Sequence, residues 1–152
     1  MHAKRIASIL AVASMLVGSL IGTATEAAAY PQVNVCGSSY GSLKQYPIVD
    51  PENGYRVGWI DTYYSSATGK NCAIARGDDS RASGFTHIDV MIGLTSQVGW
   101  AQEDGAFQNY TKYAGPVYVY APGNTCIDVA SNLLYDGYME KQGLGTATQV
   151  RC

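Results

Sequence analysis

Residues 55–76 read YRVGWIDTYYSSATGKNCAIAR, and this stretch decides the class of fold. Tyr55–Tyr64 consists of two interleaved sets of residues rich in Tyr, Val, Trp and Ile, which is the period-2 pattern of a β-strand. Ser65–Lys70 follows as a polar turn, in which Gly69 suits a position with positive φ. Asn71–Arg76 then returns as a second strand. The stretch therefore predicts an antiparallel β-hairpin.

The chain around this hairpin has the composition of an all-β protein. It contains 12 tyrosines, and its 17 glycines divide it into short segments, as expected for short strands joined by turns. We predict a small sandwich or barrel-like domain of about seven or eight short antiparallel strands. Further strands are expected at Phe85–Leu94, Gln97–Gln102, Phe107–Tyr113, Val117–Tyr120, Thr125–Val129 and Thr146–Cys152, and long loops at 37–54 and 131–145.

The N-terminus has the three parts of a secretory signal peptide. Two basic residues precede the apolar run Ile6–Ile21, and the small residues Ala27–Ala29 follow it. We predict that residues 1–29 are a signal peptide and that residues 30–152 form one secreted, extracellular domain with no membrane partner after cleavage. A retained anchor is the alternative, because the uncharged run is long enough to span a bilayer. The Gly and Ser content of the run and the Ala-rich cleavage site favour secretion.

Four cysteines, Cys36, Cys72, Cys126 and Cys152, all lie in the predicted mature domain. An even number of cysteines in an exported chain indicates two disulfides. Three pairings are possible. We favour Cys72–Cys126, which would join two interior strands, together with Cys36–Cys152, which would tie the two ends of the domain. A zinc site is disfavoured because no two cysteines are close in sequence, and we expect neither a metal nor a cofactor.

The charge of the chain argues against polyanionic partners. The formal net charge is −2, and two of the ten basic residues belong to the predicted signal peptide. Nucleic acids and anionic membranes are bound by concentrated basic surfaces, and the remaining basic residues are scattered. We therefore expect neither of these partners.

No constellation of catalytic residues is evident. His87 is the only histidine of the predicted mature domain, and Asp89 lies on the same strand face. A serine hydrolase would also need a hydroxyl beside the imidazole, and there is no strand–Ser–helix elbow. The acidic pairs Asp78–Asp79 and Glu103–Asp104 are typical of solvated turns, although the loop after Asp78 leaves a weak calcium site open. We predict a protein that is not an enzyme.

The high tyrosine content is the remaining indication of function. Exposed tyrosines can stack on sugars or contact a partner protein, whereas others simply suit β-strands. We select Tyr110, Tyr113, Tyr135 and Tyr138 as binding candidates. Tyr135 and Tyr138 fall in the expected loop 131–145 and are predicted to be the best exposed aromatic residues.

Three stretches carry a resemblance to a known family. Residues 64–72, residues 109–118 with 126–128, and residues 36–40 resemble the spore-associated protein A family of streptomycetes and their relatives. The resemblance implies a small, secreted, cysteine-paired protein associated with spores or aerial growth. It carries no catalytic residues over to this chain.

Together these observations predict a secreted, non-enzymatic surface protein of the spore or cell envelope. Its partner is expected to be a cell-wall or spore-surface polymer, or another protein, contacted through exposed aromatic side chains. Two alternatives remain. One is a secreted inhibitor of a protease or other hydrolase that uses the loop 131–145, and the other is a small hydrolase that uses His87.

Overall fold

The computed structural model describes residues 34–136 and 141–152, and every regular element in these ranges is a β-strand. The predicted signal peptide and Tyr138 lie outside the described residues. The strands are β1 (Gly41–Val49), β2 (Arg56–Ser65), β3 (Lys70–Gly77), β4 (His87–Ile88), β5 (Val90–Leu94), β6 (Gln102–Asp104), β7 (Tyr113–Tyr120), β8 (Ile127–Tyr135) and β9 (Lys141–Val150).

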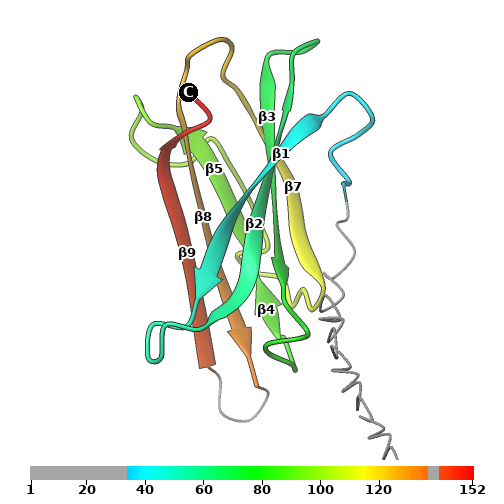
Figure 1. Ribbon diagram of the computed structural model, residues 1–152, viewed down its shortest axis with the longest axis vertical. Coiled ribbons are helices and arrows are strands. Elements are labelled where there is room, and N and C mark those ends of the chain that lie inside the picture. The colour runs from blue at the N-terminus through cyan, green and yellow to red at the C-terminus, as the bar shows by residue number, and fades with distance from the viewer. Residues whose placement is uncertain (1–33, 137–140) are drawn as a thin grey trace, which may run out of the picture.

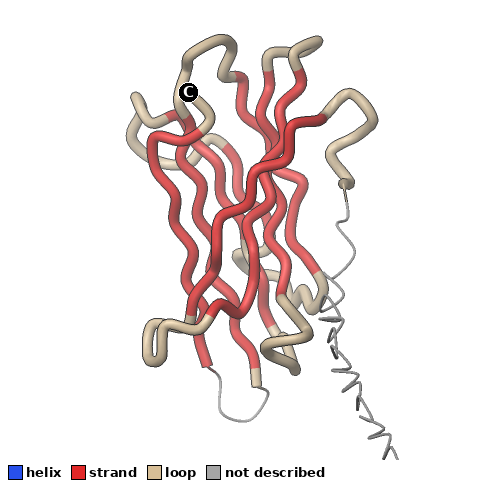
Figure 2. The backbone as a smooth tube through the Cα atoms, in the orientation of Figure 1, coloured by secondary structure: helices blue, strands red, loops and turns tan. Residues whose placement is uncertain are grey.

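These strands form one antiparallel, barrel-like sheet (Figure 1). The strand order is β6-β5-β8-β9-β1-β2-β3-β7, and the short β4 pairs with β8. The sheet curves until β7 lies beside β5 and β6. The loops gather mainly at the two ends of the long axis (Figure 2). The predicted all-β architecture is confirmed.

The barrel closes without a continuous backbone ladder between β6 and β7. Instead, two side chains of β6 accept hydrogen bonds from backbone amides of β7. The Gln102 Oε1 atom lies 2.7 Å from the Tyr118 nitrogen, and the Asp104 Oδ2 atom lies 2.8 Å from the Gly115 nitrogen. We call these two contacts the β6–β7 seam. They satisfy amides of an edge strand that would otherwise lack partners in the sheet.

The predicted hairpin is confirmed as β2 and β3, in which Tyr63 faces Cys72 and Ser65 faces Lys70. Its inward side chains join the main core, and each large apolar side chain buried there contributes roughly 1.5–3 kcal/mol. Eight large apolar side chains of this core are fully buried: Ile48, Ile60, Ile88, Val90, Ile92, Ile127, Val129 and Leu133.

Two expected loops are strands instead. Gly41–Val49 is β1, and most of the expected loop 131–145 belongs to β8 and β9. Gly143 is buried in β9 and packs closely against its neighbours. A Cβ atom at this position would lie only 2.6 Å from the Val57 Cγ2 atom and 2.8 Å from the Leu133 Cδ1 atom. Glycine is therefore required for close packing at this position, although in the sequence it resembles a turn residue.

The strand boundaries differ elsewhere as well. Phe85–Leu94 is divided into β4 and β5, and Thr125–Val129 is only the start of the longer β8. Most of Gln97–Gln102 and Phe107–Tyr113, both expected to be strands, lies in loops that flank the short β6. Nearly all side chains at both places are exposed, including Val98 and Phe107, so these segments do not provide an inward apolar face that would extend the sheet.

Two disulfides are present, as predicted, but the favoured pairing was wrong. The bonds are Cys36–Cys72 and Cys126–Cys152. Cys72 does not meet Cys126, because its side chain lies on the outer face of β3, in the small cluster with Cys36, Tyr63 and Ile74. Cys152 follows β9, which pairs directly with β8 and so brings Cys152 to Cys126.

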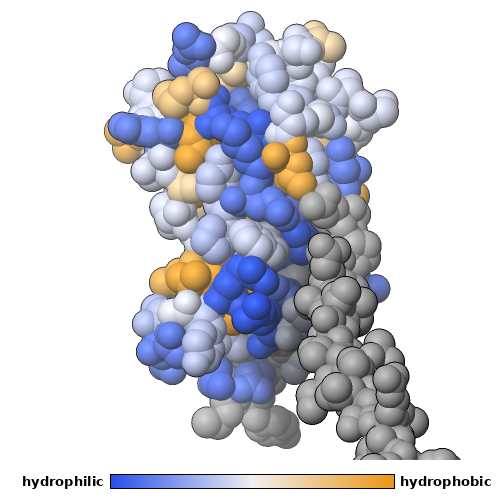
Figure 3. Space-filling view, viewed as in Figure 1, coloured by the Kyte–Doolittle hydropathy of each residue, from blue (hydrophilic) through white to orange (hydrophobic). Residues whose placement is uncertain are grey.

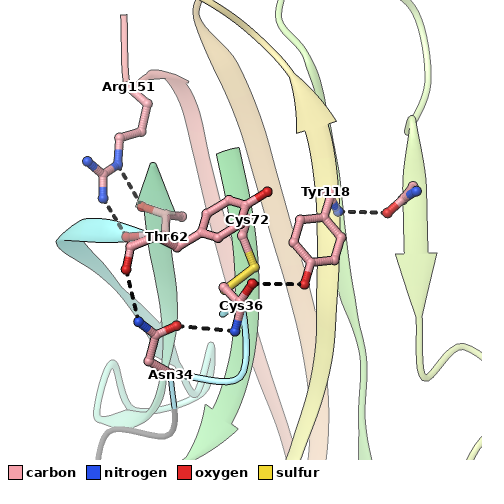
Figure 4. The surroundings of a disulfide bond; sticks show 8 residues. Asn34, Cys36, Thr62, Cys72, Tyr118 and Arg151 are labelled. Atoms are coloured by element: carbon pink, nitrogen blue, oxygen red, sulfur yellow. Dashed lines mark hydrogen bonds between the residues drawn. A yellow bond between two sulfur atoms is a disulfide. The ribbon is translucent and has the colours of Figure 1, made fainter. Parts of the chain in front are cut away.

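The Cys36–Cys72 bond holds the N-terminal segment against the outer face of the sheet (Figure 4). Cys36, Tyr63, Cys72 and Ile74 form a second, smaller core there. The Tyr118 hydroxyl donates to the Cys36 carbonyl at 3.3 Å, and its ring packs against Tyr40 with centroids 5.6 Å apart. The disulfide therefore covers apolar surface that the barrel interior does not enclose.

Candidate functional site

A pocket of about 390 Å³ opens beside the β6–β7 seam. It lies where the loop from β6 enters β7, and it contains two of the four tyrosines selected from the sequence. We call it the aromatic pocket. Its lining residues are Asp104, Asn109, Tyr110, Thr111, Lys112, Tyr113 and Gly115.

Asp104 organises the inner wall of the aromatic pocket. Its Oδ2 atom accepts the Gly115 amide of the seam, and its Oδ1 atom faces the Tyr110 hydroxyl at 3.4 Å. The negative charge of Asp104, followed by burial, raises the pKa of the Tyr110 hydroxyl. Tyr110 therefore remains a proton donor, and its half-buried ring packs against the main core.

Tyr113 also lines the pocket, and its cross-strand neighbour on β3 belongs to an ion pair. It faces Arg76 across the β3–β7 ladder and keeps 36% of its surface exposed. Arg76 is buried, and its Nε atom lies 2.7 Å from the Asp61 carboxylate. Tyr113 thus keeps part of its surface exposed, while the charge of its cross-strand neighbour Arg76 is paired with Asp61.

Phe107 adds an aromatic residue that the sequence analysis missed. It is 96% exposed in the loop between β6 and β7. A single exposed apolar side chain is common on protein surfaces, so Phe107 is of interest only because its loop continues into the lining of the aromatic pocket. The Gly105 that precedes this loop was the available signal, because it ends β6 and leaves Phe107 outside any strand.

His87 holds this loop in place. Its Nδ1 atom lies 3.0 Å from the Gln108 carbonyl oxygen, and its Nε2 atom lies 3.4 Å from the Asp89 carboxylate. Ser131 donates to the Asp89 backbone carbonyl and not to the imidazole. Both ring nitrogens thus face oxygen acceptors, an arrangement that positions a loop rather than activating a hydroxyl.

Comparison with known proteins places the chain in a family. Over 131 residues it is 31% identical to spore-associated protein A of Streptomyces coelicolor, an alignment that covers 80% of this chain and 75% of that protein. The chain belongs to the spore-associated protein A family. No protein-family profile matches it, and no solved structure matches it.

Tyr135 does not lie in an exposed loop in this member of the spore-associated protein A family. It was expected to be exposed in a loop, but it is 6% exposed near the end of β8. Its ring packs near Phe85 and its hydroxyl donates to Asp50 at 2.5 Å. The prediction was wrong because residues 131–135 continue a strand whose alternate side chains point into the core.

Asp78, which begins the loop considered for a calcium site, is engaged in the fold of this spore-associated protein A family member. Asp78 is buried and lies 2.7 Å from the Arg56 guanidinium. Burial opposes its ionisation, but hydrogen bonds from Ser80 and Arg56 outweigh burial and lower the pKa of the carboxyl. Residues 34–136 and 141–152 contain no cluster of three or more His, Cys, Asp or Glu suited to a metal.

The surface of this family member outside the aromatic pocket is mostly polar on the face shown in Figure 3. Hydrophobic residues form small, separate areas there, outside the grey atoms. Within the part of the chain that the structure describes, no helix is long and apolar enough to cross a membrane.

The aromatic pocket, with hydroxyl, amide and ammonium groups between aromatic rings, has the side chains that bind sugars by stacking and hydrogen bonding.

Proposed function

We propose that this protein is a secreted, non-catalytic surface protein of the spore or cell envelope, which binds an envelope polymer in the aromatic pocket. The observation that carries the proposal is the convergence of Tyr110 and Tyr113 in one pocket, with the exposed Phe107 two residues before Asn109 of its lining in the same loop. The printed name of the Streptomyces coelicolor relative supports an association with spores. Two disulfides suit a protein that works in an oxidising, extracellular environment.

The two alternative functions have less support. An inhibitor was expected to present a long loop at 131–145, but β8 and β9 occupy most of that range. A hydrolase was expected to use His87, but the imidazole is held between the Gln108 carbonyl and Asp89. Binding through the aromatic pocket requires neither feature.

Sedimentation with purified spore envelopes and with peptidoglycan tests the proposal. The double variant Phe107→Ala/Tyr113→Ala removes two exposed rings without emptying the core. The matched control is Tyr55→Ala/Tyr120→Ala, because these side chains are 71% and 61% exposed and do not line the aromatic pocket. Removing stacked aromatic contacts worth about 1–2 kcal/mol each predicts at least a tenfold loss of affinity.

The control variant is expected to bind like the wild type. Equal binding by the Phe107→Ala/Tyr113→Ala variant would remove the aromatic pocket from the proposal. Binding that is lost when envelope proteins are digested beforehand would point to a protein partner instead of a polymer.

A further inference from the structure

The charged groups around the aromatic pocket differ in whether they are available to a ligand. Asp104 is already engaged, since its two oxygens face the Gly115 amide and the Tyr110 hydroxyl. Arg76, the cross-strand neighbour of Tyr113, is paired with the buried Asp61. Neither group is free to pair with a ligand without breaking a contact that holds the fold.

Lys112 is different from these two groups. It lines the aromatic pocket between Tyr110 and Tyr113, it is exposed, and no carboxylate of the described residues lies within 4.0 Å of its ammonium group. Glu103, the nearest acidic residue in sequence to Asp104, points to the opposite face of β6 because side chains alternate along a strand. The charge offered to a ligand is therefore positive.

The shape of the aromatic pocket adds a second requirement. Aromatic rings present flat faces, which suit the C–H face of a pyranose ring, while the Asn109 amide and the Thr111 hydroxyl can bond to its hydroxyl groups. A short flexible peptide offers no such rigid face. The lining thus combines a stacking surface with one cation.

From this combination we infer that the polymer bound by the aromatic pocket is an anionic polysaccharide, whose sugar ring stacks on Tyr113 and whose acid group pairs with Lys112. This inference rests on the proposed function and adds the chemical class of its ligand. The acid group can be a carboxylate on the ring or a phosphodiester between units, since both pair with an ammonium group.

Three probes separate the roles of charge and ring: polygalacturonate, its fully methyl-esterified form, and poly(glycerol phosphate). The first two share one sugar backbone and differ only in charge, whereas the third carries charge without a ring. Binding is measured for the wild type, for Lys112→Gln and for Lys112→Arg. Lys70→Gln is the matched control, because Lys70 is an exposed lysine on β3 outside the aromatic pocket.

The wild type is expected to bind polygalacturonate about fivefold more tightly than the ester, with a preference that weakens as salt is raised. Lys112→Gln is expected to bind both equally, while Lys112→Arg and Lys70→Gln keep the preference. Weaker binding to poly(glycerol phosphate) than to polygalacturonate supports recognition of the sugar ring together with its acid group, whereas tighter binding to this ringless polymer contradicts stacking on Tyr113 and overturns the inference.

Equal wild-type affinity for polygalacturonate and its ester, or binding to envelopes but to none of the three probes, overturns the inference. In both cases the proposed function survives if Phe107→Ala/Tyr113→Ala still releases the protein from envelopes. A preference for the acid that persists in Lys112→Gln also contradicts the inference. If Phe107→Ala/Tyr113→Ala binds envelopes as tightly as the wild type does, the proposed function itself is wrong.

Discussion

The Tyr135 hydroxyl joins two distant parts of the chain through one carboxylate. Asp50 accepts hydrogen bonds from this hydroxyl, from the Asn53 amide at 2.9 Å and from the Glu52 backbone at 2.8 Å. The hydrogen bond from Tyr135 lowers the pKa of Asp50, although burial acts in the opposite direction. In turn, burial and the bond to Asp50 raise the pKa of Tyr135. β8 is thereby fastened to the turn between β1 and β2.

Tyr135→Phe is therefore expected to destabilise the protein. The substitution keeps the ring beside Phe85 but leaves the Asp50 carboxylate without one of its donors. We expect the melting temperature to fall by a few degrees. Tyr55→Phe, at an exposed position, is the control and is expected to melt like the wild type. An unchanged melting temperature in Tyr135→Phe would show that this hydroxyl does not support the fold.

The structure places the selected tyrosines in different surroundings. Tyr110 and Tyr113 do meet in one pocket, but Tyr135 is buried and Phe107 was placed in a strand. Sequence spacing distinguishes the two faces of a strand only when the strand itself has been found. Since β8 was expected to end at Val129, the inward direction of Tyr135 could not be read from its position.

Among the strands, the hairpin and the second half of β9 were predictable, whereas β1 and the first half of β9 were not. β2 and β3 are largely buried and rich in apolar and β-branched residues, with a turn signal between them. β1 reads GSLKQYPIV and has one buried apolar residue, Ile48, while β9 reads KQGLGTATQV and is buried mainly at Gly143 and Gly145. The partners of these two strands supply most of their stability, and tertiary packing of that kind is not visible in a local pattern.

The β6–β7 seam makes a prediction for individual amides. In Gln102→Ala the Tyr118 amide loses its acceptor, whereas the Gly115 amide keeps the Asp104 oxygen. A hydrogen bond worth about 1 kcal/mol predicts about fivefold faster hydrogen exchange at Tyr118. Exchange at Gly115 is expected to stay unchanged, and Asp104→Ala is expected to give the reverse pattern. Equal acceleration at both amides would mean that the seam opens as one unit.

At the scale of the whole molecule, acid is expected to weaken the fold. The pKa values of Asp50 and Asp78 are both lowered from the ordinary value of 3.8. A lowered pKa in the folded state contributes stability that is present above the unfolded value and is lost as the pH falls through the folded value. The loss is therefore expected below about pH 4.

Urea unfolding at pH 7, 5 and 3 measures this effect. We expect similar midpoints at pH 7 and 5 and a clearly lower midpoint at pH 3. In Asp78→Asn the midpoint at pH 7 is expected to be lower, and the further loss at pH 3 smaller, because one of the two carboxylates is absent. A midpoint that rises between pH 5 and 3 would contradict the assigned roles of these carboxylates.

The proposed function depends on the aromatic pocket being the surface that contacts the envelope. NMR titration of the labelled protein with soluble fragments of the spore envelope tests this most directly. We expect changes in chemical shift to be concentrated in residues 105–115, with little change at the opposite loops 95–101 and 121–126. Shifts confined to those opposite loops, or no shifts at fragment concentrations that compete with envelope binding, would contradict it.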